Sequence, residues 1–231
     1  MREIVFDTET TGLDPTQGDR MVEIGCIELV NRFPTGKAFH CYFNPDRDMP
    51  EAAFKVHGLS VDFLKDKPRF AEKAEELIAF LGEAPLVAHN AIFDLGFLNA
   101  ELERAGSIVV SRERLVDTLL LARRKHPGGA NRLDDLCVRY SIDNSKRTKH
   151  GALLDAELLA EVYIELIGAR QAQLGLSRTS VPAEFSGKVI ALRERPIPLA
   201  ARITEETRAE HLAFVKSLGD GAIWLDYVSS V

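Results

Sequence analysis

The 231-residue sequence is poor in the residues on which small secreted proteins and membrane proteins depend. Its three cysteines, Cys26, Cys41 and Cys137, have the spacing of neither a disulfide framework nor a zinc motif. The simplest expectation from this cysteine usage is a reducing, cytoplasmic location. No run of apolar residues approaches the roughly 20 that a helix needs to cross a bilayer, so we expect no membrane partner.

Positive charge is also scarce. The chain has 29 Lys and Arg residues against 35 Asp and Glu, which gives a formal net charge of −6 at pH 7. A protein that coats DNA without regard to sequence would be basic, so the composition argues against that class. An enzyme that grips a nucleic acid only at its end, or through a bound metal, stays compatible with it. The hydrophobic share of 45% is typical of a globular protein.

The first third of the chain has the patterns of β-strands. Residues 3–6 (EIVF) are mainly apolar, with the β-branched Ile4 and Val5 at their centre. Residues 21–30 alternate between apolar and polar, and residues 37–43 form a third strand-like segment. Turn-forming residues at 12–15 and 31–36 separate the three segments. Three strands this close in sequence predict an antiparallel meander at one side of a sheet.

Helical patterns dominate the middle of the chain. Apolar residues recur at helical spacing over 71–81, and further helices are expected at 91–105, 133–140 and 153–167. Asn90 is placed to cap the helix at 91–105. Short buried strands are expected at 86–88 and near Val116. This order predicts an α/β fold, in which helices flank a mixed sheet.

The pattern changes after Gly168. Residues 177–203 contain prolines and arginines without a sustained period, which predicts a linker. Thr204 is a plausible N-cap for a helix that begins with Glu205 and Glu206. We therefore expect a main domain over residues 1–176, a linker over 177–203 and a small C-terminal segment over 204–231.

Two acids follow the first predicted strand. In the segment FDTETTG, Asp7 and Glu9 are two residues apart, so strand alternation directs both carboxylates to the same face. Two adjacent like charges are costly unless a cation lies between them, and hard oxygen ligands favour Mg²⁺ or Mn²⁺. The alternative is a solvated strand end followed by a turn.

Two further segments place acids beside histidines. In HNAIFDLGFL, Asp94 lies one turn into its helix and faces the strand edge, whereas His89 is more readily a hydrogen-bonded structural residue than a ligand. In KRTKHGALLDAE, His150 and Asp155 are five residues apart, which separates them by about 140° on one continuous helix. They converge only if His150 lies in the loop before the helix and Asp155 on its inward face.

Together these segments resemble the DEDDh family of 3′→5′ exonucleases. The resemblance is carried by DTETTGL, VHGLS, HNAIFDLGFL and LDDLCVRYSIDNSKRTKHGALLDAELLAEVY, and it covers nearly the whole chain. It implies a ribonuclease H-like fold with a mixed five-stranded sheet. It also implies that four carboxylates and one histidine form the catalytic site: Asp7, Glu9, Asp94, Asp155 and His150.

The resemblance further implies a mechanism that uses two divalent cations, Mg²⁺ or Mn²⁺. The metal ligands would be Asp7, which bridges both ions, Glu9 and Asp155 at the ion that carries the water, and Asp94 at the second ion. His150 would take the proton from that water, since an imidazole is a suitable general base near neutral pH. The product would be a nucleoside 5′-monophosphate.

The residues that hold the terminal nucleotide are also implied by the resemblance. This set comprises Thr8, Thr10, Thr11, Leu13, His57 and Phe93. For Leu13 and Phe93 the alternative is a place in the hydrophobic core. The basic runs at 123–125 and 146–147 are either phosphate contacts or solvated surface.

Within the family, the C-terminal region resembles that of proofreading members, which act on single-stranded or frayed DNA 3′ ends. Gln171, Leu174 and Leu176 resemble a sliding-clamp motif, and Phe214 and Trp224 are the expected anchors for a polymerase catalytic subunit. Two alternatives remain: an RNA-trimming exoribonuclease of the same superfamily, and a non-catalytic module that stabilises a polymerase.

Overall fold

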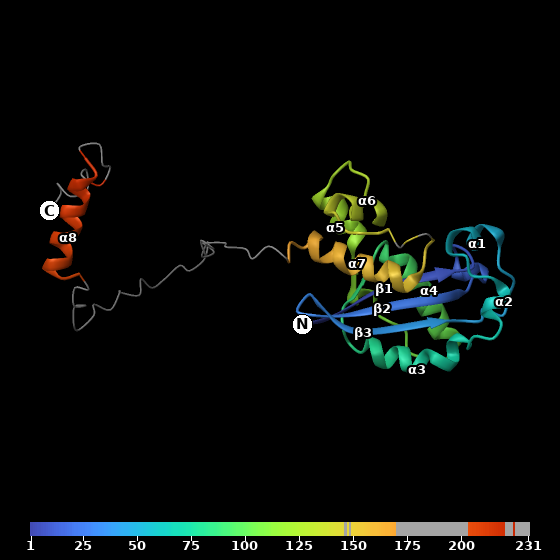
Figure 1. The fold of residues 1–231 in the computed structure, drawn as a ribbon. Helices are drawn as coiled ribbons and strands as arrows, with labels where there is room; N and C mark the ends of the chain where they lie inside the picture. Colours follow the sequence, from blue (N-terminus) through green and yellow to red (C-terminus); the bar gives the residue numbers. More distant parts are fainter. Residues whose placement is uncertain (146, 148, 170–202, 220–223, 225–231) are drawn as a thin grey trace, which may run out of the picture. The chain divides into compact units, whose positions relative to one another are not determined.

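The structure is a computed structural model, which describes residues 1–145, 147, 149–169, 203–219 and 224 (Figure 1). The chain separates into two units, Met1–Leu174 and Gly175–Val231. Except for Ile203, the linker expected at 177–203 lies outside the described residues. None of the helices in the described part of the chain has the length and apolar character that a bilayer span requires.

A mixed five-stranded sheet forms the centre of the first unit, as the sequence predicts. Its strand order is β3-β2-β1-β4-β5. The strands β1 (Arg2–Thr10), β2 (Met21–Val30) and β3 (Phe33–Tyr42) form the antiparallel meander. The short strands β4 (Leu86–Ala88) and β5 (Leu115–Asp117) continue the sheet in parallel with β1.

The first strand is longer than its apolar pattern indicates. Its pairing with β2 continues through Asp7, opposite Gly25, and Glu9, opposite Glu23, before the register shifts between Glu9 and Thr10. The two acids therefore lie within the strand rather than after it. Backbone pairing extends the strand past its last apolar residue, because the hydrogen bonds of the ladder do not depend on side-chain hydropathy.

The turn between β2 and β3 is shorter than expected. It needs only Asn31 and Arg32, which both have positive φ values, 52° and 70°. Consecutive residues of this kind are the signature of a tight two-residue hairpin. As a result β3 begins at Phe33, four residues before the predicted start.

Helices cover both faces of the sheet. Alternate residues of β1 separate the two layers: Ile4 and Phe6 pack with residues of α3 (Phe70–Leu81) and α4 (Ala91–Arg104), whereas Val5 packs with α7 (Ala152–Leu166). Figure 1 shows α3 and α7 on opposite sides of the strands. The helices α5 (Thr118–Lys125) and α6 (Leu133–Tyr140) add a third cluster against α7.

Short helical segments escaped the sequence prediction. These are α1 (Glu51–His57), α2 (Val61–Leu64) and the single 3₁₀ turns η1 (Pro15–Gln17) and η2 (Arg112–Arg114). A segment of three to seven residues is too short to display a helical period. One capping prediction was wrong: Asn90 occupies the N-cap position of α4 but has a left-handed backbone, and its side chain makes no capping bond.

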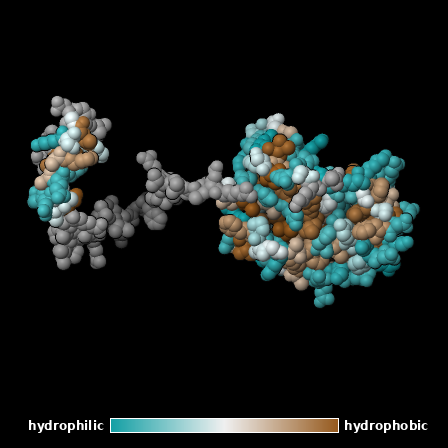
Figure 2. Space-filling model, viewed as in Figure 1, coloured by the Kyte–Doolittle hydropathy of each residue, from teal (hydrophilic) through white to brown (hydrophobic). Residues whose placement is uncertain are grey.

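The described part of the second unit is mainly α8 (Glu205–Ser217). Its start is as predicted, because the Thr204 hydroxyl accepts a hydrogen bond from the Thr207 N–H at 3.2 Å. The expected anchor residues Phe214 and Trp224 are 62% and 56% exposed. Figure 2 shows apolar residues on the surface of this helix beside hydrophilic ones.

Candidate active site

Three elements bring four carboxylates together. Asp7 and Glu9 extend from β1, Asp94 lies in the first turn of α4, and Asp155 lies in the first turn of α7. Both Asp94 and Asp155 are buried, as is Glu9. Strand alternation directs Asp7 and Glu9 to the same face, as expected from their spacing.

Asp94 is tied directly to β1. Its Oδ1 accepts hydrogen bonds from the Thr8 N–H at 3.1 Å and from the Thr8 hydroxyl at 2.7 Å. These contacts fix the start of α4 against the strand that carries Asp7 and Glu9. Thr8 thus positions a carboxylate, and it does not line the cavity that the other predicted nucleotide-binding residues share.

A glycine in β2 lets α7 reach the sheet. A Cβ atom on Gly25 would lie 2.4 Å from the Cα and N atoms of Leu153, which is far inside van der Waals contact. Because Gly25 also pairs with Asp7, this close approach sets Asp155 beside the β1 acids. The first turn of α7 could not occupy this place with any larger residue at position 25.

His150 lies in the loop before α7, where it meets Asp155. Its Nδ1 is 3.2 Å from Asp155 Oδ2, and its side chain is 49% exposed. One ligand atom from each of Glu9, His150 and Asp155 lies within 4.8 Å of the others. The structure therefore brings together the five residues expected to be catalytic, and their roles stay a prediction.

The acids affect one another's ionisation. Burial raises the pKa of Asp7 well above its ordinary value, and the nearby Asp94, Glu9 and Asp155 raise it further. Burial, with Asp155 next in importance, raises the pKa of Glu9 to about 8. Burial also raises the pKa of Asp94 to about 7, although hydrogen bonds from Thr8 oppose the shift. Ionising all of these groups together requires added positive charge.

Arg147 supplies part of that charge, which the sequence did not reveal. Its guanidinium bonds both Asp155 oxygens, at 2.6 and 2.8 Å, and both Asp134 oxygens at 2.7 Å. It also lies 2.7 Å from His150 Nδ1, and its side chain is only 7% exposed. Burial favours a higher pKa for Asp155, but hydrogen bonds from Arg147 and His150 lower it. Residue 147 is thus part of the acidic site rather than of a solvated basic run.

The donor set fits hard divalent cations. Carboxylate oxygens are the ligands that Mg²⁺ and Mn²⁺ prefer, and here they come from four acids whose mutual repulsion a cation would relieve. Part of the rise in the pKa values of Asp7 and Glu9 comes from this repulsion, after the larger effect of burial. Asp7, Glu9, Asp94 and Asp155 are therefore the candidate metal ligands.

An apolar cavity of about 470 Å³ adjoins the acids. It is lined by five of the predicted nucleotide-binding residues: Thr10, Thr11, Leu13, His57 and Phe93. Leu13 is 83% exposed, which excludes the core position that the sequence left open for it. Phe93 is partly buried and packs against the fully buried ring of Phe97 at 5.0 Å between centroids.

His57 presents a hydrogen-bond donor in this cavity. Its Nδ1 accepts from the Leu59 N–H at 3.0 Å, so the proton of the neutral ring belongs on Nε2. Burial lowers the pKa of His57, which favours this neutral form. Among the described residues, the buried Nε2 has no hydrogen-bond partner. Such a donor is costly to leave unpaired, and a bound ligand would satisfy it.

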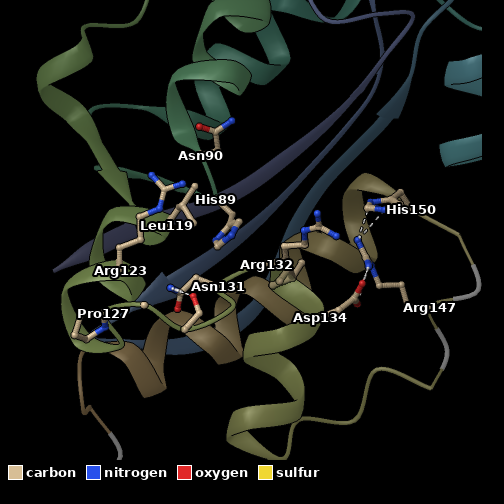
Figure 3. Close-up of a pocket in the computed structure, with 13 residues that line it drawn as sticks. His89, Asn90, Leu119, Arg123, Pro127, Asn131, Arg132, Asp134, Arg147 and His150 are labelled. Atoms are coloured by element: carbon tan, nitrogen blue, oxygen red, sulfur yellow. Dashed lines mark hydrogen bonds and ion pairs between the residues drawn. The ribbon is translucent and has the colours of Figure 1, made fainter.

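A larger cavity of about 1020 Å³ lies on the His150 side of the acids (Figure 3). Its lining includes His89, Arg123, Arg132, Arg147 and His150. His89 Nδ1 is 2.9 Å from the Thr118 hydroxyl, and burial lowers the pKa of His89. This is the hydrogen-bonded structural role that the sequence favoured for His89.

The proposed partner contacts are only partly visible. Gln171, Leu174 and Leu176, expected to bind a sliding clamp, lie outside the described residues. Phe214 and Trp224 are exposed, so both are accessible to a partner. These assignments stay predictions.

Comparison with known proteins places the chain in a class. The sequence matches the family described as Exonuclease over residues 4–163. The fold is similar to that of exonuclease I, with a TM-score of 0.63 and 19% identity over 74% of this chain and 41% of that one. It is also similar to exonuclease X in complex with 5′ overhanging duplex DNA, with a TM-score of 0.55 and 24% identity over 72% and 91% of the two chains. At these identities the likeness establishes the ribonuclease H-like exonuclease fold.

Curated relatives identify a more specific group within the exonucleases. DNA polymerase III subunit epsilon of Rickettsia felis is 45% identical over 94% of this chain and 97% of its own length. The protein of the same name from Escherichia coli K12 is 41% identical over 96% and 97% of the two chains. The chain therefore belongs to the exonuclease family, together with these DNA polymerase III epsilon subunits.

Proposed function

We propose that this protein is a metal-dependent 3′→5′ DNA exonuclease that removes mismatched 3′-terminal nucleotides as a subunit of the replicative DNA polymerase. The observation that carries the proposal is the convergence of Asp7, Glu9, Asp94, Asp155 and His150 beside an apolar cavity of about 470 Å³. The names of relatives that match along nearly the whole chain support the proofreading role.

Four carboxylates would hold two divalent cations, Mg²⁺ or Mn²⁺. Asp7 would contact both ions, with Glu9 and Asp155 at one and Asp94 at the other. When bound, such ions make water nucleophilic and stabilise charge on the leaving oxygen. The protein's contribution is to fix the ligands: Thr8 orients Asp94, and the approach of α7 to Gly25 sets the place of Asp155.

His150 would act as the general base. Its half-exposed ring is reachable by water, and its contact with Asp155 at 3.2 Å orients the imidazole. The water oxygen attacks the terminal phosphorus and His150 receives its proton. The bond from phosphorus to the 3′ oxygen of the preceding nucleotide breaks. The products are a nucleoside 5′-monophosphate and a strand shortened by one nucleotide with a free 3′ hydroxyl.

The apolar cavity would receive the terminal nucleotide. Leu13 and Phe93 offer apolar surface to any base, and the His57 Nε2–H offers a hydrogen bond. This lining does not select among bases, which suits an enzyme that removes whichever nucleotide is mispaired. Selectivity arises because separating a mismatched end from its template costs less free energy than separating a paired one.

The C-terminal region, from about residue 171 onward, would connect the exonuclease to its partners. Phe214 and Trp224 would contact the catalytic (alpha) subunit of the polymerase, and Gln171, Leu174 and Leu176 would contact the sliding clamp. Tethering of this kind raises the effective concentration of the exonuclease near the primer end. It also compensates for the weak general DNA affinity expected of a chain with a net charge of −6.

A comparison of DNA and RNA tests the proposal. Mn²⁺-supported release of the terminal nucleotide is measured from a mismatched DNA primer and from an RNA of the same sequence, with Asp7→Ala as the inactive control. We expect DNA to be degraded and mismatched ends to be degraded faster than paired ones. Degradation of RNA alone would show an exoribonuclease, and degradation of neither would favour a non-catalytic module.

A further inference from the structure

The larger cavity differs in chemistry from the apolar one. It joins the start of α4 to α5 and to the beginning of α6, and it reaches His150 at the catalytic end (Figure 3). None of the described residues that line it is Phe, Tyr or Trp. A ligand there would not be held by stacking on such rings. Its volume of about 1020 Å³ exceeds the 470 Å³ of the apolar cavity.

Two arginines on its rim are free to bind an anion. Arg123 comes from α5 and Arg132 from the residue before α6, and both are exposed. Among the described residues neither guanidinium forms an ion pair, in contrast to Arg147, which is neutralised by Asp134 and Asp155. Figure 3 shows Arg123 and Arg132 on either side of His89 in that view. The free charge of this cavity is therefore positive, although the whole chain is acidic.

A third polar group belongs to the same rim. Asn90 lines the cavity, and its left-handed backbone, with φ of 66°, keeps its side chain out of the capping bond expected at that position. Left-handed residues of this kind cluster at ligand sites. The Asn90 amide is therefore available as a further hydrogen-bond donor.

Resting on the proposed function, we propose that this cavity binds the phosphodiester backbone of the strand on the 5′ side of the scissile bond, through Arg123 and Arg132. The apolar cavity binds the terminal base, and the carboxylates lie at the scissile phosphate. The larger cavity, called the basic cavity from here on, binds the phosphates that precede it. This assigns the direction of the strand across the protein: from α5 and α6, past His150, to Leu13 and Phe93.

The contact chemistry favours the backbone of the nucleic-acid strand that is being degraded. Arginine recognises phosphate through a planar fork of donors, and such contacts do not depend on base sequence. A ligand that begins beside His150 and runs along the cavity is continuous with the reacting phosphate. The strand being degraded satisfies that continuity without an additional partner.

The chain supplies a matched control. Arg112 and Arg124 are also exposed, are free of ion pairs among the described residues, and line a different cavity, which His150 does not line. Arg124 even follows Arg123 directly in α5. The double variants R123A/R132A and R112A/R124A remove the same charge from two places, so a general electrostatic effect would be equal in both.

The test compares a substrate that has a preceding strand with one that has none, and the difference in leaving group cancels when the ratio of the two rates is compared between variants. One is a single-stranded oligothymidylate, and the other is the p-nitrophenyl ester of thymidine 5′-monophosphate, which has no preceding nucleotide. For R123A/R132A we expect the ratio of kcat/KM values, oligonucleotide over ester, to fall by about tenfold. The slope of log affinity against log salt should flatten by about 1.4, the loss of two phosphate contacts to a single strand. R112A/R124A should keep the wild-type ratio and slope.

The outcomes separate this inference from the function it rests on. An unchanged ratio in R123A/R132A, or an equal fall in R112A/R124A, would overturn the assignment of the cavity. Failure of the wild-type protein to cleave either substrate would instead contradict the proposed function. In that case fluorescence anisotropy of a labelled oligothymidylate, which requires no turnover, tests whether the cavity binds the strand. We expect R123A/R132A to bind the oligothymidylate more weakly than R112A/R124A does. Equal affinities would overturn the inference.

Discussion

At the scale of single residues, the four carboxylates combine repulsion with function. Removing Asp7 takes away a candidate metal ligand that lies near Glu9, Asp94 and Asp155, each of which raises its pKa. We expect Asp7→Ala to abolish hydrolysis and to leave the fold as stable as the wild type, or more stable, in EDTA. Primer hydrolysis and thermal unfolding measured side by side check this. Wild-type activity in the variant would exclude the two-ion site.

His150 is the residue whose role is easiest to separate from metal binding. His150→Ala should lower kcat by roughly 10²–10⁴-fold, the usual contribution of a general base, while the carboxylate ligands stay in place. Titration of Mn²⁺ by electron paramagnetic resonance should give an affinity close to that of the wild type. A large loss of Mn²⁺ affinity would identify His150 as a ligand instead.

Removing Arg147 should destabilise the metal-free protein, in contrast to the removal of Asp7. Its side chain and that of Asp155 are 7% and 3% exposed, and breaking a buried pair by removing one partner costs about 3 kcal/mol or more. Arg147→Gln should therefore lower the free energy of unfolding in EDTA, and Mn²⁺ should restore part of the loss by neutralising Asp155. Asp62→Asn, which removes the acid of an exposed pair with Lys65, serves as the control with little effect. Equal unfolding energies for Arg147→Gln and the wild type would show that the pair adds nothing.

At the scale of elements, Gly25 fixes the distance between β2 and α7. Gly25→Ala places a Cβ where the backbone of Leu153 now lies, so the first turn of α7 must move and carry Asp155 with it. We expect severe loss of exonuclease activity. Gly96→Ala is the matched control, because a Cβ there meets nothing within 4 Å in the middle of α4. That substitution should retain activity and add up to about 1 kcal/mol of stability from helix propensity. Full activity in Gly25→Ala would contradict the proposed packing role.

The element scale also shows what the sequence can predict. Long periodic segments were predicted with their bounds nearly correct, including β2 at Met21–Val30 and α6 at Leu133–Tyr140. The extension of β1 beyond Phe6 was missed because pairing with β2, not side-chain hydropathy, sustains it. The helix α1 was missed because seven residues show no clear period.

The same limit applies to the candidate site. The acids and His150 were identified from motifs and a family resemblance. For His150 to meet Asp155, the sequence required only that His150 lie in the loop before α7, which is where the structure has it. Arg147 belongs to a basic run in the sequence. Its partners Asp134 and Asp155 lie on the helices before and after it, and a sequence pattern does not show that a loop residue turns inward to pair with both. The sequence also does not show that the members of the basic run at 123–125 have different surroundings. Arg123 lines the basic cavity, whereas Lys125 bonds the Glu165 and Leu166 carbonyls at the end of α7.

At the scale of the whole molecule, stability in the absence of metal should depend on pH. Asp7, Glu9 and Asp94 have pKa values above their ordinary ones in the folded protein, so the folded state binds more protons than the unfolded state. The contribution of these groups to stability therefore falls as pH rises from about 3.8, the ordinary value for the two aspartates, through the raised pKa of about 8 for Glu9. Thermal unfolding in EDTA should show this decline.

Divalent cations should reverse the decline. Mn²⁺ binds the ionised acids of the folded protein, so the increase in Tm it causes should be larger at pH 8 than at pH 5. The variant Asp7→Ala should show a smaller increase at both pH values. An equal increase at both pH values in the wild type would indicate that the ion binds elsewhere.

The central claim is that β1, α4 and α7 together form a cation site with a nucleotide cavity beside it. Anomalous diffraction from a crystal soaked in Mn²⁺ and thymidine 5′-monophosphate tests it most directly. We expect two anomalous peaks ligated by Asp7, Glu9, Asp94 and Asp155, with the base between Leu13 and Phe93. Carboxylates that point apart, with no anomalous peak among them at saturating Mn²⁺, would contradict the account.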